Sequence, residues 1–185
     1  MQAIVFLLNA LFDIYLMIVL LRVWLQWARA DFYNPLSQFV VKATHPILAP
    51  MRRVIPSLGG LDLAAVLLAL IVAVLKFTTL TLLLGAPFQP VVMLIFSLLL
   101  VVKQAGTLLF WMLVLRAILS WVSQGRSPVD YVLLQLTEPM LAPIRRIIPH
   151  LGGLDLSVLV LFLILQAVNI FLSTSGWIGL IWTQL

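Results

Sequence analysis

Four long apolar stretches dominate the pattern of hydrophobic and polar positions along this chain of 185 residues. They lie near residues 3–27, 62–84, 91–122 and 155–182. A helix of about 20 apolar residues crosses the hydrocarbon core of a bilayer, and each stretch reaches that length. The pattern therefore predicts an all-α membrane protein with four transmembrane helices.

The two long loops between these stretches, 28–61 and 123–154, are closely similar in sequence. Residues 44–63 read THPILAPMRRVIPSLGGLDL, residues 137–156 read TEPMLAPIRRIIPHLGGLDL, and 15 of the 20 positions are identical at an offset of 93. Such self-similarity indicates two tandem repeats, which we place at 1–88 and 89–185. Each repeat crosses the membrane twice and returns to the same side. We therefore expect parallel repeats rather than the inverted repeats of many transporters.

Each long loop opens with a capping residue followed by proline at the first helical position, which are signals that start a helix. These pairs are Asn34-Pro35 and Ser127-Pro128. Apolar residues then recur at helical spacing, namely Leu36, Phe39, Val40 and Ala43, and Val129, Val132, Leu133 and Leu136. We predict a short amphipathic helix at the membrane interface in each loop. Because proline disrupts a helix interior, we expect Pro46 and Pro139 to end these helices.

An arginine pair flanked by prolines follows in both loops. The residues are Pro50, Arg52, Arg53 and Pro56 in the first loop, and Pro143, Arg145, Arg146 and Pro149 in the second. We expect no continuous helix through these segments, and we expect the repeat to bring the arginine pairs into one basic patch. The patch either holds the loops in the cytoplasm and contacts anionic lipid headgroups, or binds an acidic partner.

A glycine pair and an aspartate close each loop. They are Gly59, Gly60 and Asp62 in the first loop, and Gly152, Gly153 and Asp155 in the second. Glycine pairs allow a tight turn. A carboxylate at the start of a helix accepts hydrogen bonds from the first free N–H groups and favours the positive end of the helix dipole. We expect both aspartates to be helix caps rather than functional acids.

Composition excludes several function classes. The chain is 64% hydrophobic and 9% charged, whereas a soluble domain is about a quarter charged. It contains no cysteine, which excludes disulfides, thiol catalysis and cysteine-ligated metals. With two histidines and six acidic residues, we expect no metal site. The net charge of +5 comes from basic residues beside the apolar stretches, so we expect no nucleic-acid partner.

The distribution of lysine and arginine predicts the orientation. Both long loops carry basic residues, whereas the N-terminus, the turn at 85–90 and the C-terminus carry none. Basic loops stay in the cytoplasm, so we expect cytoplasmic loops and both termini outside. Residues 1–21 contain no lysine or arginine, and their apolar run continues to about Trp27. We expect a permanent helix there rather than a signal peptide.

Charged residues inside the apolar stretches are costly and are candidates for function. They are Asp13, Lys76 and Lys103. Asp13 and Lys76 each lie roughly 20 Å from the basic ends of their helices, at 1.5 Å per residue. We expect an ion pair that joins the first two spans. The repeat places neutral Thr107 and Asn169 at the equivalent positions, with an offset of 94 for Thr107 because the second copy has one residue fewer between Trp121 and Pro128. The alternatives are an ion or proton path, snorkelling, or a partner contact.

Small residues form a stripe on the second span. Ala65, Ala69 and Ala73 recur every four residues. Such a stripe lets two helix backbones approach closely in a membrane. We expect it to be a packing face, either within the chain or between two copies.

The segment DFYNPLSQFVVKATHPILAPMRRVIP and its counterpart SPVDYVLLQLTEPMLAPIRRIIPHLGGLD resemble the YggT family of small bacterial inner-membrane proteins, called the YlmG family in Gram-positive bacteria. The matching positions are Asn34, Pro35, Thr44, Pro46, Pro50, Arg52, Arg53, Pro56, Thr137, Pro139, Pro143, Arg145, Arg146 and Pro149. The resemblance implies a multi-pass protein of the bacterial cytoplasmic (inner) membrane. It also implies links to osmotic tolerance and potassium homeostasis, to cell division or nucleoid organisation, or, as in chloroplast relatives, to haem attachment. It implies no catalytic residues.

The residues argue against a bound haem. Haem-binding bundles offer axial histidine or methionine on facing helices. His45 and His150 lie in the loops, and their repeat counterparts are Glu138 and Ser57. We expect no cofactor.

Three function classes remain. The first is a non-enzymatic scaffold or assembly factor that binds membrane lipids and a membrane protein or a second copy of itself. The alternative is a small potassium or proton transporter or channel subunit that acts as an oligomer. An enzyme is disfavoured because the sequence shows no nucleophile–base set, no metal-ligand cluster and no phosphate-binding glycine loop.

Overall fold

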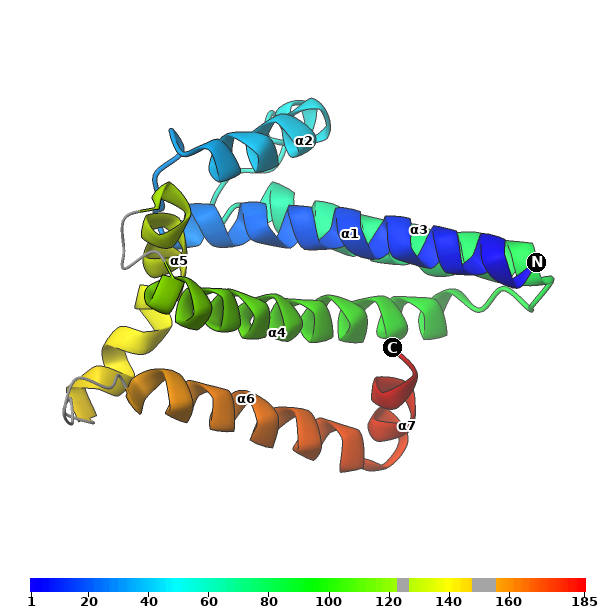
Figure 1. Ribbon diagram of the computed structural model, residues 1–185. Helices are drawn as coiled ribbons and strands as arrows, with labels where there is room; N and C mark the ends of the chain where they lie inside the picture. Colours follow the sequence, from blue (N-terminus) through cyan, green and yellow to red (C-terminus); the bar gives the residue numbers. More distant parts are fainter. Residues whose placement is uncertain (123–126, 148–155) are drawn as a thin grey trace.

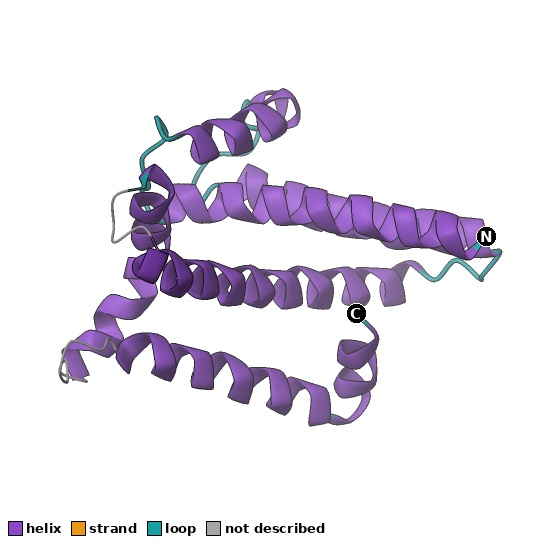
Figure 2. Cartoon of the chain, viewed as in Figure 1, coloured by secondary structure: helices purple, strands orange, loops and turns teal. Residues whose placement is uncertain are grey.

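The computed structural model describes residues 1–122, 127–147 and 156–185, and these residues form seven helices (Figures 1 and 2). The helices are α1 (Gln2–Trp27), α2 (Pro35–Met51), α3 (Leu63–Leu84), α4 (Pro90–Val122), α5 (Pro128–Ile147), α6 (Leu156–Thr174) and α7 (Gly176–Gln184). Within the described ranges there is no β-strand, and an isolated bridge joins Leu58 to Leu61. The all-α prediction is confirmed.

Four of these helices, α1, α3, α4 and α6, are long and apolar enough to cross a membrane, which indicates a multi-pass membrane protein. They run side by side, with α2 beside the C-terminal part of α1 and α5 at the end where α1 and α4 finish (Figure 1). α1, α3 and α4 all pack against one another, whereas α6 packs mainly against α4 among the long helices. The first three predicted spans agree with the observed helices to within one residue at each end.

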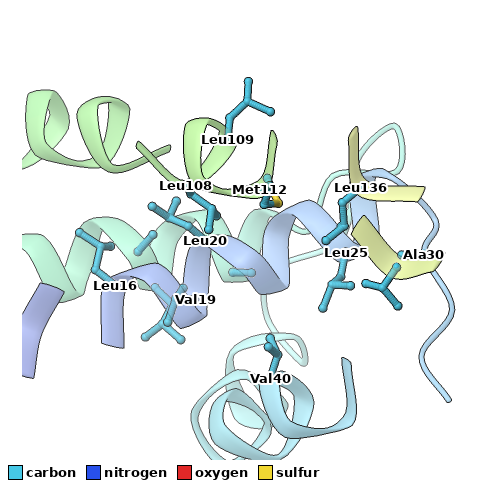
Figure 3. Packing of buried hydrophobic residues seen from close by; sticks show 14 of the residues in the cluster. Leu16, Val19, Leu20, Leu25, Ala30, Val40, Leu108, Leu109, Met112 and Leu136 are labelled. Carbon is cyan, nitrogen blue, oxygen red and sulfur yellow. The ribbon is translucent and has the colours of Figure 1, made fainter. Parts of the chain in front are cut away.

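The buried core lies where α1, α3 and α4 meet. Leu16, Val19 and Leu20 of α1 are at most 6% exposed, and Leu16 and Leu20 lie near Leu108 of α4 (Figure 3). The two loop helices extend this core, because α2 contributes Val40 and α5 contributes Leu136 (Figure 3). The loops are therefore part of the folded body.

The expectation that Pro46 and Pro139 end the loop helices is wrong. α2 continues through Pro46 and Pro50, and α5 continues through Pro139 and Pro143 to include both arginines of its pair. All four prolines are exposed. A proline frees the carbonyl four residues before it, and here the freed carbonyls lie on the outer side of each helix. The buried stripe on the opposite side stabilises the helical course.

The buried stripes are similar in the two loop helices. In α2 they comprise Ser37, Val40, Thr44 and Leu48, and in α5 they comprise Val132, Leu133, Leu136, Thr137 and Leu141. Residues four apart lie on one face of a helix, so each helix packs a narrow stripe on the protein. Phe39, which we expected on the apolar face, is 58% exposed and points away from the chain's own core.

The predicted span 155–182 is two helices rather than one. α6 ends at Thr174, and α7 begins at Gly176, whose φ is +52°. The Ser173 and Thr174 hydroxyls donate to the Ile170 carbonyl at 2.8 and 2.9 Å, and such bonds compete with the helix ladder. Gly179 then lies so close to the end of α6 that a Cβ atom there would overlap the Ser173 carbonyl. α7 therefore folds back toward α4 (Figure 1).

Candidate functional site

The charged residues predicted to pair inside the membrane do so. Lys76 Nζ lies 2.6 Å from Asp13 Oδ1, which joins α3 to α1. The Lys76 side chain is 7% exposed and the Asp13 side chain 33%. Gln104 Nε2 of α4 donates to the same oxygen at 3.3 Å. Sequence reasoning missed Gln104, although its polar side chain interrupts an apolar span next to Lys103. The cluster links the three packed helices and neutralises both charges.

A second polar cluster lies in a cavity of about 360 Å³ between α4, α6 and α7. Lys103 Nζ donates to the Trp182 carbonyl at 2.8 Å and lies 5.8 Å from the centre of the Trp182 ring. Trp182 Nε1 donates to Asn169 Oδ1 at 2.9 Å. The lysine and the asparagine thereby hold α7 against α4 and α6. Trp182, absent from our predicted site residues, connects them.

Thr107 and Asn169, the neutral counterparts of Asp13 and Lys76, do not hydrogen-bond to each other. Thr107 Oγ1 donates to the Lys103 carbonyl one turn earlier in α4, at 2.9 Å, and Asn169 accepts from Trp182 instead. Both side chains line the same cavity. The reason is that α6 stands farther from α4 than α3 stands from α1, so two short polar side chains do not meet.

The first arginine pair is divided between an internal role and an exposed one. Arg52 Nε donates to Asp62 Oδ2 at 3.0 Å, Arg52 Nη2 contacts the same oxygen, and Nη2 also donates to Gln26 Oε1 at 3.3 Å. Asp62 is 1% exposed and accepts from Ala65 N at 3.3 Å as the cap of α3. The predicted cap is confirmed, and it is also an ion pair. Arg53 is exposed.

A tight turn in the chain brings Arg52 close to Asp62. Gly59 and Gly60 have φ of +60° and +88°, and Leu58 and Leu61 exchange backbone hydrogen bonds across them. The chain reverses there, so residues ten positions apart meet at the start of α3. In the sequence, this ion pair could have been predicted from an arginine and an aspartate on the two sides of a glycine pair.

The second arginine pair is divided in a similar way, with a different acidic partner. Arg145 Nη1 lies 2.8 and 2.9 Å from the two carboxylate oxygens of Glu138, two turns earlier in α5. Arg146 is exposed. Asp155, the counterpart of Asp62, lies outside the described residues, as does Pro149. The cap predicted for Asp155 stays a prediction.

The expected single basic patch is not what Figure 1 shows. The C-terminal ends of α2 and α5, which lead to or carry the arginine pairs, lie far apart on the molecule (Figure 1). α2 runs beside α1, whereas α5 runs away from it toward α6. The exposed members of the two arginine pairs, Arg53 and Arg146, are therefore separate on the chain.

The remaining motif residues have structural contacts. Asn34 Oδ1 caps α2 by accepting from Leu36 N at 3.0 Å, and Asn34 Nδ2 donates to the Pro128 carbonyl at 2.6 Å. Trp24 Nε1 of α1 donates to the Leu136 carbonyl of α5 at 3.0 Å. Buried polar groups need such partners. These bonds connect α1 and the first loop directly to the second loop.

The two motif threonines make matching contacts. Thr44 Oγ1 donates to the Val40 carbonyl and Thr137 Oγ1 to the Leu133 carbonyl, each at 2.8 Å, and both threonines are 0% exposed. In the second loop, Arg116 Nη1 also donates to Thr137 Oγ1. Pro35 occupies the first position of α2, as predicted, while Pro56 lies exposed in the connection to α3.

Within the described parts of the chain, no three histidine, aspartate, glutamate or cysteine side chains gather closely enough to hold a metal ion. In the described ranges the polar groups include the ion pairs Asp13–Lys76, Arg52–Asp62 and Arg145–Glu138, and the exposed arginines Arg29, Arg53 and Arg146.

Comparison of the sequence with those of known proteins identifies the family of this chain. The family model CCB3/YggT matches residues 1–83 and 95–176. The chain is 59% identical to an "uncharacterized protein in proC 3'region" of Vibrio alginolyticus, over 100% of both chains. It is 49% identical to the "uncharacterized protein YggT" of Escherichia coli strain K12, over 91% of this chain and 88% of that one. An uncharacterized protein of Haemophilus influenzae is 39% identical over 84% and 83%. No solved structure matches the chain. The chain belongs to the CCB3/YggT family.

Proposed function

We propose that this protein is a non-enzymatic scaffold or assembly factor of the bacterial cytoplasmic membrane. The observation that carries the proposal is the contrast between its charges. Asp13 and Lys76 satisfy each other inside the membrane-spanning bundle, whereas Arg53 and Arg146 are exposed at the two loop ends. The internal charges support the fold, and the exposed ones are available to other molecules.

Exposed apolar side chains accompany both arginines. Val54 is 83% exposed beside Arg53, and Ile147 is 82% exposed beside Arg146. Arginine is enriched at protein interfaces, where apolar contacts and a polar rim combine. The partner we propose is a membrane protein with an acidic juxtamembrane segment, and the anionic lipid surface supports its docking.

The topology we propose has two parallel repeats with both long loops in the cytoplasm and both termini outside. The basic residues of the loops support this orientation. α2 and α5 then act as amphipathic helices at the cytoplasmic interface, with exposed Phe39 and Tyr131 facing lipid headgroups or the partner. Effects on osmotic tolerance or on cell division, which the family resemblance implies, follow from the assembly that the loops support.

Site-specific photo-crosslinking tests the scaffold proposal. A photoreactive residue at Val54 or Ile147 is expected to crosslink a defined membrane protein in living cells, and Arg53→Glu or Arg146→Glu is expected to remove that product. The matched control is Phe6, which is 70% exposed at the opposite end of α1 and is expected to crosslink no such protein. The same product from all three positions, or none from Val54 and Ile147, would contradict the proposal.

The cavity between α4, α6 and α7 favours a second candidate, a small cation transporter or channel subunit that works as an oligomer. Lys103 and Asn169 line a cavity of about 360 Å³, and the side chains of Thr107 and Gln166 add further polar groups to its wall. Potassium and proton flux into proteoliposomes of pure protein tests it. Flux that Asn169→Leu abolishes, or that Asp13→Asn abolishes, would favour transport over the scaffold. Absence of flux together with the crosslink would exclude transport.

A further inference from the structure

A second and larger cavity lies at the C-terminal end of α1, between α1 and α2. Its volume is about 560 Å³. It is open on one side and is lined by Arg22, Gln26, Phe32, Gln38, Val41 and Lys42. Neither Arg53 nor Arg146 lines this cavity, so it is separate from the surfaces of the scaffold proposal.

Arg22 is the unusual residue of this cavity. It is 8% exposed, and its guanidinium carbon lies 4.9 Å from the centre of the Phe32 ring. Its Nη1 is buried and has no hydrogen-bond acceptor among the described residues. Leaving a charged donor buried and unpaired costs more free energy than leaving a neutral one so. A cation with an open donor at a cavity wall is a binding group for an anion.

The second repeat lacks this open donor. Arg116 corresponds to Arg22 at an offset of 94, because the second copy has one residue fewer between the end of its span and its loop helix. Arg116 donates Nη1 to Thr137 Oγ1. In the first repeat the equivalent threonine, Thr44, donates to the Val40 carbonyl, and no bond from Arg22 to it is present within the described residues. The same residue type is therefore used internally in one repeat and left open in the other.

The residues of the cavity wall are also more cationic in the first repeat than at the equivalent positions of the second. Lys42, which is exposed at the rim of the cavity, has Gln135 as its counterpart, and Gln135 accepts a hydrogen bond from Asp31 N at 2.9 Å. Gln38 has Tyr131 as its counterpart. The second cationic group is thus particular to the first repeat.

The surrounding charges favour an anion. Arg22 and Lys42 line the cavity, and the nearby acid, Asp62, is already paired with Arg52. The side-chain oxygen Oε1 of Gln26 accepts from Arg52, which leaves the Gln26 side-chain N–H groups as donors at the cavity wall. Guanidinium, ammonium and amide donors around one space match the oxygens of a phosphate group.

We propose that this cavity binds the phosphate of an anionic phospholipid headgroup. The phosphate would lie between Arg22 and Lys42, and the apolar Phe32 and Val41 would contact the glycerol and the start of the acyl chains. The cavity is at the end of a spanning helix and beside α2, whose Phe39 and Ile47 are 58% and 44% exposed, and it is open toward the surface. This is the depth at which lipid headgroups lie.

Lipid retention measured by native mass spectrometry tests the proposal. The full chain in non-ionic detergent is offered phosphatidylglycerol or phosphatidylcholine with identical acyl chains. We expect phosphatidylglycerol to be retained about tenfold more strongly, as two charge-assisted contacts permit. Arg22→Gln is expected to abolish this preference and Lys42→Gln to reduce it about fivefold. The matched control in the second repeat, Arg116→Gln, is expected to keep it.

Further measurements keep the test decisive. Lys42 is exposed, so Lys42→Gln reports on binding even if Arg22→Gln does not fold. Equal retention of the two lipids, or an equal loss in Arg22→Gln and Arg116→Gln, would overturn the proposal. Displacement of phosphatidylglycerol by millimolar inorganic phosphate would reassign the cavity to a soluble phosphate. The scaffold proposal is judged by crosslinks at Val54 and Ile147, so the two proposals fail separately.

Discussion

Helices α3 and α6 hold equivalent positions in the two repeats, yet they are packed very differently. α3 buries Ala64, Ala65, Leu68, Ala69, Val72, Ala73 and Lys76, and the pairs it makes with α1 and α4 are close. In α6, every residue of which is described, Ser157 and Leu161 are the buried ones. α6 lies beside α4 at a distance that leaves a cavity.

The sequence difference that explains this contrast is small. The stripe of Ala65, Ala69 and Ala73 on α3 is 0% exposed, as expected of a packing face. At the offset of 93, α6 carries Val158, Phe162 and Gln166 instead. Small residues let helix backbones approach, and larger ones hold them apart. Near-identical loops therefore do not impose identical helix packing, because the spans alone decide how closely they approach.

The largest loss of folding stability is expected at the ion pair of Lys76 in α3, because α6 carries no charge at the equivalent position. Asp13→Asn leaves the Lys76 ammonium buried without its counter-charge, which costs about 3 kcal/mol. Lys76→Met alone is expected to destabilise less, since Asp13 keeps Gln104 as a partner and is one-third exposed. The double variant is expected to be milder than the sum of the single changes. Thermal unfolding in detergent, followed by size-exclusion chromatography, measures all three.

The matched change in α6 is Asn169→Leu, at the position equivalent to Lys76. It removes one hydrogen bond from Trp182, so we expect a loss of about 1 kcal/mol. A loss as large as that of Asp13→Asn would show that α6 is as tightly integrated as α3. Additive effects of Asp13→Asn and Lys76→Met would show that the two residues act independently.

The second largest loss of folding stability is expected from changes to the alanine stripe. Ala69→Leu adds three carbon atoms at a fully buried contact and is expected to cost about 1–3 kcal/mol by overpacking. Leu159→Phe enlarges a side chain of α6 that is 57% exposed and is expected to change stability by less than about 0.5 kcal/mol. Scanning calorimetry in detergent compares the two. Equal destabilisation would contradict the idea that α3 and α6 differ in packing.

The smallest effect on overall stability is expected from the closing turn. Gly179→Ala places a Cβ atom against the Ser173 carbonyl, so α7 must move away from α6. Because α7 is peripheral, the midpoint of thermal unfolding is expected to change little, while the fluorescence of Trp182, which is 5% exposed, shifts to the red. Gly106→Ala is the control, since nothing lies within 4 Å of its Cβ position. It is expected to leave the fluorescence unchanged and to stabilise α4 by up to about 1 kcal/mol.

Unchanged fluorescence in Gly179→Ala would contradict the close packing of α7 on α6.

Hydropathy predicted the spanning helices well, because the thickness of a bilayer fixes their length. It failed where local rules compete with packing. The helical course through Pro46 and Pro139 depends on which side of the helix faces the protein, and a linear pattern does not show that. The break at Gly176 depends on a positive φ within an apolar stretch, which hydropathy alone reads as one continuous span.

The candidate site was predictable in part. Asp13 and Lys76 were matched by their equal depth, and Asp62 by its place at a helix start. The partner of Arg52 was missed because the turn at Gly59–Gly60 sets the return path of the chain. The open donor of Arg22 was missed for another reason. The sequence gives Arg22 and Arg116 the same place in the repeat, and the difference lies in what each side chain reaches.

The bonds between the two loops affect the order in which the protein is made. The Trp24 indole and the Asn34 amide find their acceptors 112 and 94 residues further along the chain. At a synthesis rate of about 5–20 residues per second, the first half waits roughly 5–20 s for these acceptors to leave the ribosome. During that interval the helix pair of α1 and α3 sits in the bilayer with open donors at its basic end. A lipid, an insertion factor or a second nascent chain can reach them then, so pairing of the halves is a step of biogenesis that truncation after α3 would arrest.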